Sequence, residues 1–137
     1  MAVFTRAIAV RAPRRGLHEI TGQVAEVVEK GGVLEGMCTL FICHTSASLV
    51  VQENYDPSAR VDLERFLDRL VPEGASWMTH TLEGPDDMPS HIKSALTQVS
   101  LSIPIVGGRL ALGTWQGIYL WEHRDSPTPR ELLVSVF

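Results

Sequence analysis

The sequence predicts an α+β fold, a single domain of mostly antiparallel strands with about three helices. Apolar residues recur at helical spacing in three segments. In the C-terminal third they alternate instead, and Gly107-Gly108 marks a hairpin there. A chain of 137 residues is long enough for one hydrophobic core and too short for two comfortable domains, so we take residues 1–137 as one domain.

Each of the three helical segments carries a start or a stop signal. The first ends at Gly31-Gly32, which can adopt the left-handed conformation of a helix C-terminus. The second begins at Asp56-Pro57, with Asp as the N-cap and Pro at the first helical position, and the third begins at Asp86 or Asp87. The expected apolar faces are Ile20, Val24, Val27 and Val28, then Ala59, Leu63, Phe66, Leu67 and Leu70, then Ile92, Ala95, Leu96 and Val99.

Strands are predicted for residues 2–10, 37–44, 101–105, 109–123 and 132–137. Residues 37–44 have apolar side chains on both faces, so we expect this strand to be buried on both sides. Cys38 and Cys43 point to opposite faces of it and are expected to be unbridged, reduced and buried thiols.

One face of the segment 109–123 is aromatic, if no bulge intervenes at Gly113 or Gly117. Its members are Trp115, Tyr119, Trp121 and His123. This is too much aromatic surface to leave in water, so it should meet a second layer or another subunit. The opposite face would carry Gln116 and Glu122 among apolar residues.

Composition and charge exclude several classes of function. The hydrophobic fraction of 45% and the charged fraction of 20% are those of an ordinary globular protein. A formal net charge of -4 argues against a nucleic-acid partner. No run of about eighteen apolar residues is present, so no membrane span is predicted. Arg6 interrupts the stretch where a signal peptide would need apolar residues, and we therefore expect a cytoplasmic protein.

The stretch 80–91 gathers two histidines and three carboxylates around one Gly-Pro turn. His80 and His91 could combine with His44, which ends an apolar strand face, into a three-imidazole metal site that keeps one position open. The spacing matches no tight zinc signature, and each histidine taken alone is more often a structural or surface residue.

Acidic and hydroxyl side chains near these histidines suggest further roles. Glu83 could orient an imidazole or act as a general base. For Asp86 and Asp87 a purely structural role at the start of a helix, as caps, is the simpler explanation. The candidate substrate contacts are Thr45, Ser46, Ser48, Asn54 and Thr114. Serine-rich turns are usually structural, and the end of the strand at Asn54 could simply start the turn to the next helix.

The segments HTSASLVVQEN (44–54), HTLEGPDDMPSHIK (80–93) and GGRLALGTWQGIYLWEH (107–123) resemble the YjbQ family, which is named for secondary thiamine-phosphate synthase activity. The resemblance implies an α+β sandwich-like fold, a homotrimer and a metal-associated pocket near the subunit boundary. It implies His44, His80 and His91 as ligands, Glu83 and Asp87 as acid/base or supporting groups, and Gln116 as a substrate contact. The tail 123–130 departs from the Asp-Gly-Pro-Arg turn of many relatives, which puts any role of that turn in doubt.

Three hypotheses for the function follow. The resemblance implies an enzyme that joins a pyrimidine pyrophosphate to a thiazole phosphate. Three imidazoles, however, prefer zinc or another transition metal, whereas diphosphate departure is usually assisted by Mg²⁺ on carboxylates. The second hypothesis is therefore a metal-dependent hydrolase of a small phosphorylated or carbonyl substrate. The third is a non-catalytic trimeric module that binds a metal or a small anion.

Overall fold

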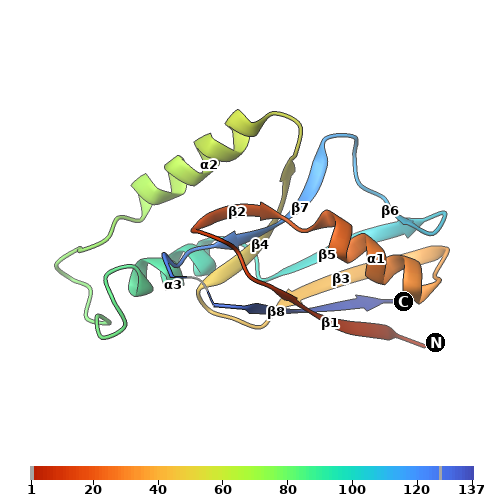
Figure 1. Cartoon of the computed structure of the whole chain (residues 1–137), viewed down its shortest axis with the longest axis horizontal. Coiled ribbons are helices and arrows are strands. Elements are labelled where there is room, and N and C mark those ends of the chain that lie inside the picture. The colour runs from red at the N-terminus through yellow and green to blue at the C-terminus, as the bar shows by residue number, and fades with distance from the viewer. Residues whose placement is uncertain (1, 127) are drawn as a thin grey trace.

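The computed structural model describes residues 2–126 and 128–137, and it has two antiparallel sheets and three helices (Figure 1). The larger sheet has the strand order β1-β8-β3-β5-β6, and the smaller one has the order β2-β7-β4. The strands are β1 (Phe4–Val10), β2 (Gly16–Glu19), β3 (Glu35–Ile42), β4 (Ala47–Glu53), β5 (Ser100–Val106), β6 (Arg109–Leu110), β7 (Gln116–Glu122) and β8 (Arg130–Val136). The helices are α1 (Thr21–Gly31), α2 (Pro57–Leu70) and α3 (Asp87–Leu96). The predicted α+β class is confirmed.

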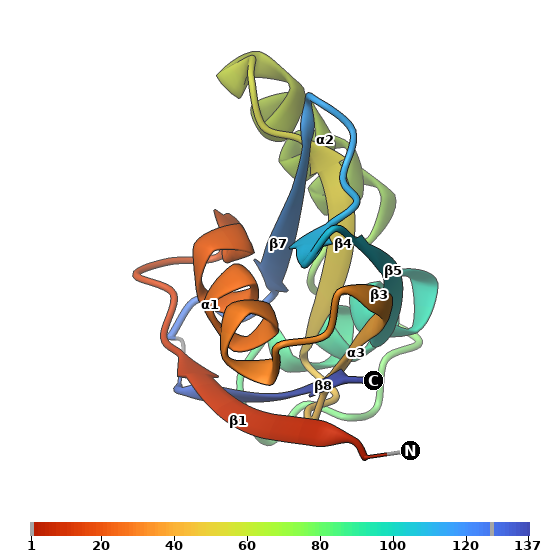
Figure 2. The ribbon, with the colours of Figure 1, turned by 90° about the vertical axis from the view of Figure 1, so that its right-hand side faces the viewer.

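The main core lies where α1 meets the inner faces of both sheets (Figure 2). Strand β5 buries every second residue, as its alternation predicts. Helix α1 buries Val24, Val27 and Val28, and its C-cap Gly32 has a φ of 66°. The strands contribute Cys38, Leu40, Ile42, Leu49, Ile103, Ile105, Ile118, Leu120, Leu132, Val134 and Val136.

A second, smaller cluster covers the aromatic face of β7. Tyr119 and Trp121 pack with Leu17 of β2 and with Leu67 and Val71 at the end of α2. The second layer is therefore supplied within the chain for Tyr119 and Trp121, whereas Trp115 lies before β7 and is 54% exposed. Helix α2 begins at its predicted N-cap, Asp56, whose side chain accepts a hydrogen bond from Ser58 N–H.

The prediction of one strand over residues 109–123 is wrong. Strand β6 pairs with β5 over two residues, and β7 lies in the other sheet. Between them the chain crosses from one sheet to the other and closes a turn in which Gln116 N–H donates to Gly113 O.

Three predicted burial patterns are also wrong. On α2 the predicted apolar face is buried at Leu67, whereas Phe66 and Leu70 are exposed, because only one side of this helix packs against β2 and β7. Strand β3 buries one face only: Cys38, Leu40 and Ile42 are buried, whereas Phe41 on the opposite face is exposed. Cys43, beyond the strand, is exposed as well.

On the third predicted helical segment only Ile92 of the expected apolar face is half-buried, against the second cluster, whereas Leu96 is 58% exposed and Val99, beyond the end of α3, is exposed as well. The face that α3 buries carries Ser90, whose hydroxyl donates to His123 O beyond the end of β7, and Lys93, which donates to Asp68 of α2.

None of the helices in the described ranges is both long and apolar enough to cross a membrane.

Candidate functional site

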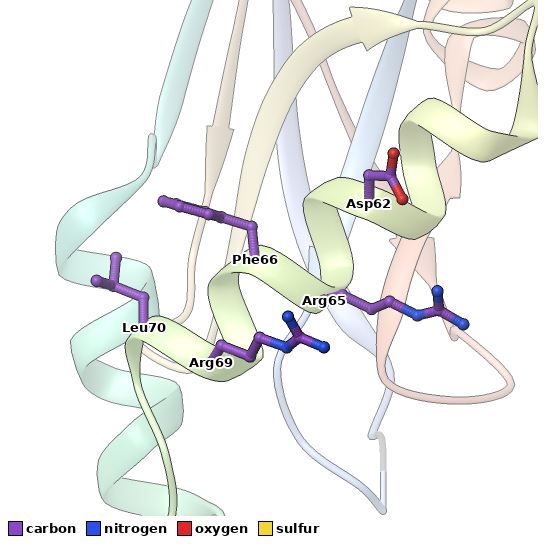
Figure 3. Close-up of a pocket in the computed structure, with 5 residues that line it drawn as sticks. All are labelled: Asp62, Arg65, Phe66, Arg69 and Leu70. Carbon is purple, nitrogen blue, oxygen red and sulfur yellow. The ribbon is translucent and has the colours of Figure 1, made fainter.

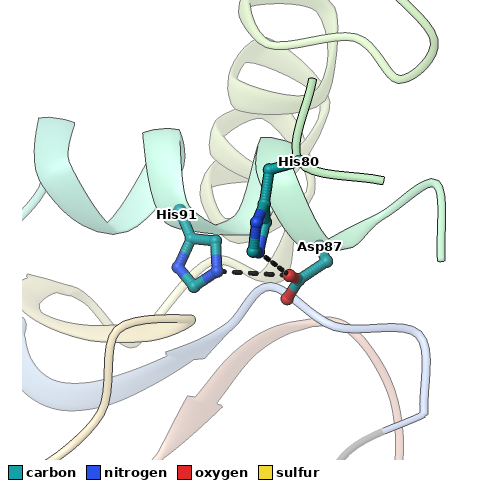
Figure 4. Close-up of side chains that lie close together, drawn as sticks. All are labelled: His80, Asp87 and His91. Carbon is teal, nitrogen blue, oxygen red and sulfur yellow. Dashed lines mark hydrogen bonds and ion pairs between the residues drawn. The ribbon is translucent and has the colours of Figure 1, made fainter. Parts of the chain in front are cut away.

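Three side chains that could bind a metal converge at the start of α3 (Figure 4). Asp87 is the first residue of the helix, His91 lies one turn later, and His80 comes from the loop before it. Asp87 Oδ2 lies 2.7 Å from His80 Nε2 and 3.3 Å from His91 Nε2. The candidate ligand atoms of this His80–Asp87–His91 cluster all lie within 4.8 Å of one another.

The hydrogen bonding of His91 decides what its Nε2 atom can do. His91 Nδ1 lies 3.0 Å from the carbonyl oxygen of Thr45, which only accepts hydrogen bonds, so Nδ1 carries the proton. In a neutral ring Nε2 then presents a lone pair to the Asp87 carboxylate. Two acceptors facing each other at 3.3 Å are stable when the ring is protonated or when a cation lies between them.

Asp87 is held as a carboxylate although its side chain is only 2% exposed. Burial by itself raises the pKa of Asp87, but the charges of His91 and Arg124 and a hydrogen bond from His80 outweigh it and hold the pKa below its usual range.

Arg124 binds the acidic turn formed by Glu83, Asp86 and Asp87, and this role was not predicted from the sequence. Its guanidinium donates to Asp87 Oδ1, to Asp86 Oδ2 at 3.0 Å and to Glu83 O at 2.8 Å. Asp86 therefore binds Arg124 rather than capping the helix, since α3 has no side-chain cap. Three planar donors on one guanidinium fix the orientation of the turn, which leaves Asp87 Oδ2 free for the histidines.

A buried polar network attaches α3 to β4 and β7. Ser90 Oγ lies 2.8 Å from His123 O, and Ser48 Oγ lies 2.9 Å from His123 Nε2. Burial, with the positive charges of Lys93 and Arg130, lowers the pKa of His123 to about 3, so this ring is neutral at neutral pH. Ser48, a predicted substrate contact, is fully buried in this network.

The predicted three-histidine set does not form within the chain. His44 Nε2 accepts a hydrogen bond of 2.8 Å from Glu131 N–H, so its lone pair is used. Burial, together with the charge of Arg130, lowers the pKa of His44. The side chain of His44 is turned to the start of β8, and a carboxylate, Asp87, takes the third place in the cluster.

A buried ion pair holds the loop that carries Thr45. Arg130 Nε donates to Glu122 Oε1 at 2.8 Å, and Arg130 Nη2 donates to Glu122 Oε2. The Glu122 side chain is 0% exposed. Arg130 Nη2 also lies 3.3 Å from Ser46 O. The pair thus positions the backbone whose Thr45 carbonyl selects the tautomer of His91. Glu122 on an apolar face was the available sequence signal, whereas Arg130 lies in the tail 123–130, of which Pro127 is outside the described residues.

Three predicted site residues lie at the other end of the small sheet. Glu53 pairs with Gln116, whereas Ala47 pairs with Glu122 beside the cluster. Six residue steps of about 3.3 Å place Gln116 roughly 20 Å from that end. Asn54 Nδ2 donates to Glu19, and Thr114 is exposed in the turn. The three segments therefore do not meet in one pocket within a single chain.

The cluster borders a cavity of about 430 Å³, which shares His80 with it. The other residues that line the cavity are Gly74, Ala75, Ser76, Met78, Thr81, Gly84, Pro85 and Met88. A second hollow of about 520 Å³ lies along the outer face of α2, between Phe66 and Leu70 and the two arginines Arg65 and Arg69 (Figure 3). No histidine or cysteine lines that hollow, so the cavity at His80 is the better candidate for a substrate.

Comparison with known proteins assigns the chain. The family described as "UPF0047 protein YjbQ-like" matches residues 6–137. The chain belongs to the YjbQ family. A UPF0047 protein of Synechocystis is 50% identical over 129 residues, covering 94% of this chain and 88% of that protein. The YjbQ protein of Salmonella typhimurium is 44% identical over 134 residues, covering 97% of this chain and 96% of that protein.

Solved structures of this family share the fold. A YbjQ-like protein of unknown function from Sulfolobus solfataricus has a TM-score of 0.87 at 28% identity, covering 98% of this chain and 96% of that one. A conserved hypothetical protein from Thermus thermophilus has a TM-score of 0.85 at 36% identity, covering 96% of this chain and 99% of that one. The YjbQ resemblance of the three sequence segments is thus confirmed along almost the whole chain.

Proposed function

We propose that this YjbQ-family protein is a metal-dependent hydrolase of a small phosphorylated molecule. In this proposal His80 Nε2, His91 Nε2 and Asp87 Oδ2 bind one transition metal ion, with zinc as the first candidate. The observation that carries it is the contact of two imidazole nitrogens with one carboxylate oxygen at the start of α3.

The donor set fits zinc or iron better than magnesium. Adjacent ligands around a tetrahedral zinc lie about 3.3 Å apart, close to the 3.3 Å between His91 Nε2 and Asp87 Oδ2. Two histidines and one carboxylate also leave coordination positions open, as catalytic zinc and non-haem iron sites do. Mg²⁺ prefers oxygen ligands and is the weaker candidate.

When bound, such an ion polarises a phosphoryl oxygen and lowers the pKa of a water molecule. In the reaction, water adds to phosphorus, the bond from phosphorus to the ester oxygen breaks, and the alcohol and inorganic phosphate leave. The exposed carboxylate of Glu83, four residues before Asp87 in the chain, takes the proton of the attacking water and returns it to the leaving alcohol. The arginine of the site, Arg124, is already paired with Asp86 and Asp87, so binding of an anionic substrate depends on the metal.

Thiamine-phosphate synthesis is the second candidate, since the family resemblance implies it. It requires departure of a diphosphate, and the acidic turn of Glu83, Asp86 and Asp87 offers the oxygen ligands that a magnesium diphosphate needs. Asp86 and Asp87 are, however, occupied by Arg124, which places this reaction below hydrolysis. Release of pyrophosphate from the two substrates, lost in His80→Ala, would reverse that order.

A homotrimer is the assembly proposed with this function. Phe41 and Leu133 pair across β3 and β8 on the uncovered face of the large sheet, and both are exposed. Exposed apolar side chains of this kind are stabilised when they are buried against another copy, which supports the proposed assembly. Light scattering should give about three times the chain mass of 15.1 kDa, and a monomeric mass would contradict the trimer.

Metal analysis of protein purified without a histidine tag tests the proposal. We expect close to one transition metal ion per chain, and a loss of most of it in His80→Ala, His91→Ala and Asp87→Asn. His18→Ala is the matched control, because His18 lies in β2 and hydrogen-bonds to Arg14 O. A wild-type protein that binds no metal would overturn the proposal. A metal-loaded protein without turnover of phosphate esters would favour the non-catalytic module.

A further inference from the structure

We infer that the cavity beside His80 binds an uncharged aromatic group of the substrate, so that the preferred substrate is an aryl or heteroaryl phosphate rather than a sugar or polyol phosphate. This inference rests on the proposed function and specifies its substrate class. It is carried by the residues that line the cavity and by its position next to a candidate metal ligand.

The lining of the cavity is mostly apolar and, apart from His80, free of ionisable side chains among the described residues. Ala75, Met78, Pro85 and Met88 supply the apolar surface, and Ser76 and Thr81 supply two hydroxyl groups. A charged group placed there would lose its water without gaining a partner, which is costly. The cavity therefore selects an uncharged group.

The chemistry of the lining favours an aromatic ring. Thioether sulfur makes favourable contacts with aromatic rings, and methionine adapts to irregular shapes. Met78 and Met88 come from different elements, the loop after α2 and the first turn of α3, and both line the cavity. A volume of about 430 Å³ is within the range of small-molecule sites.

His80 connects this cavity to the proposed chemistry. Its ring lines the cavity, and its Nε2 atom lies 2.7 Å from Asp87 Oδ2. A phosphate held at the metal would therefore place its organic group beside the same ring. A polyol in that position would leave several hydroxyl groups facing apolar side chains, and it should bind less tightly.

The methionines allow a direct test that does not depend on turnover. The zinc-loaded protein is labelled with ¹³C at the methionine methyl groups and titrated with phenylphosphonate and, separately, with methylphosphonate. We expect the Met78 and Met88 methyl signals to shift with phenylphosphonate, and phenylphosphonate to bind at least about tenfold more tightly. Met37, in β3, is the internal control and should not move.

Two variants test the cavity itself. Ala75→Leu fills it and should reduce the affinity for phenylphosphonate to that for methylphosphonate, with zinc content unchanged. Met88→Gln, which keeps the length of the side chain and adds a polar amide, covers the case in which the first variant does not fold. Equal binding of the two phosphonates by a zinc-loaded wild type, without shifts at Met78 and Met88, would overturn the inference and leave the metal proposal standing.

The neutral probe benzyl alcohol separates the two proposals, because it needs no metal. Shifts of Met78 and Met88 with benzyl alcohol in a protein that binds no zinc would support the aromatic cavity and end the proposed function. Absence of those shifts would overturn the cavity in either case.

Discussion

Acidification from pH 8 to pH 5 should destabilise this protein chiefly through His123. The folded state keeps this buried imidazole neutral, with a pKa of about 3, whereas the unfolded chain takes up a proton near the ordinary pKa of about 6.5. The unfolded state therefore binds more protons between these values, so stability is fully present above about pH 6.5 and falls as the pH is lowered towards 3. At pH 5 this difference corresponds to a loss of about 2 kcal/mol.

The assay is urea unfolding of metal-free protein at both pH values, for the wild type and for His123→Gln. The glutamine can still bond to Ser48 but does not titrate, so the variant should lose about 2 kcal/mol less than the wild type on acidification. His44, whose pKa is also lowered, contributes in the same direction in both proteins. The pKa values of Asp86 and Asp87 are lowered, so the contribution of these two carboxylates to the stability of the folded protein is lost only below about pH 4. An identical pH dependence of wild type and variant would refute the reasoning.

The remaining predictions concern the buried ion pair, two glycines and the two thiols. Glu122→Gln leaves the charge of its buried arginine partner uncompensated and should cost about 3–5 kcal/mol in urea unfolding, and a loss below 1 kcal/mol would contradict the role of the pair. Neither Gly22 nor Gly32 has a neighbour that an added Cβ would meet, so the backbone conformation decides the effect of alanine at each position. Gly22→Ala in α1 should stabilise the folded protein by about 0.4–1 kcal/mol. Gly32→Ala, at a φ of 66°, should destabilise it by about 1–2 kcal/mol. Cys43 is exposed and should react with a thiol reagent in the folded protein. Burial raises the pKa of Cys38 to about 11 and should protect this thiol until the protein unfolds. Rapid labelling of both cysteines in the folded protein would contradict the burial of Cys38.

Local signals in the sequence were reliable where they acted within one element. The Asp56-Pro57 start of α2, the glycine stop of α1 and the alternation of β5 are all properties of neighbouring residues, and the structure reproduces them. The apolar periodicity of α3, by contrast, did not predict which of its side chains are buried. Periodicity reports which side chains could be buried, whereas Ser90 and Lys93 are buried because their partners come from distant segments.

For the candidate site, the sequence by itself determined that His80, Asp87 and His91 would lie together, because they are joined by one short turn and one helical turn. Only the tertiary structure decided the rest. It turned His44 towards β8, brought Arg124 onto the acidic turn and set the Thr45 carbonyl against His91. These contacts join residues about 40 to 90 positions apart, and no pattern of spacing encodes them. They depend on which strand ends the two sheets place side by side, and this also explains why Gln116 lies far from His80 and His91.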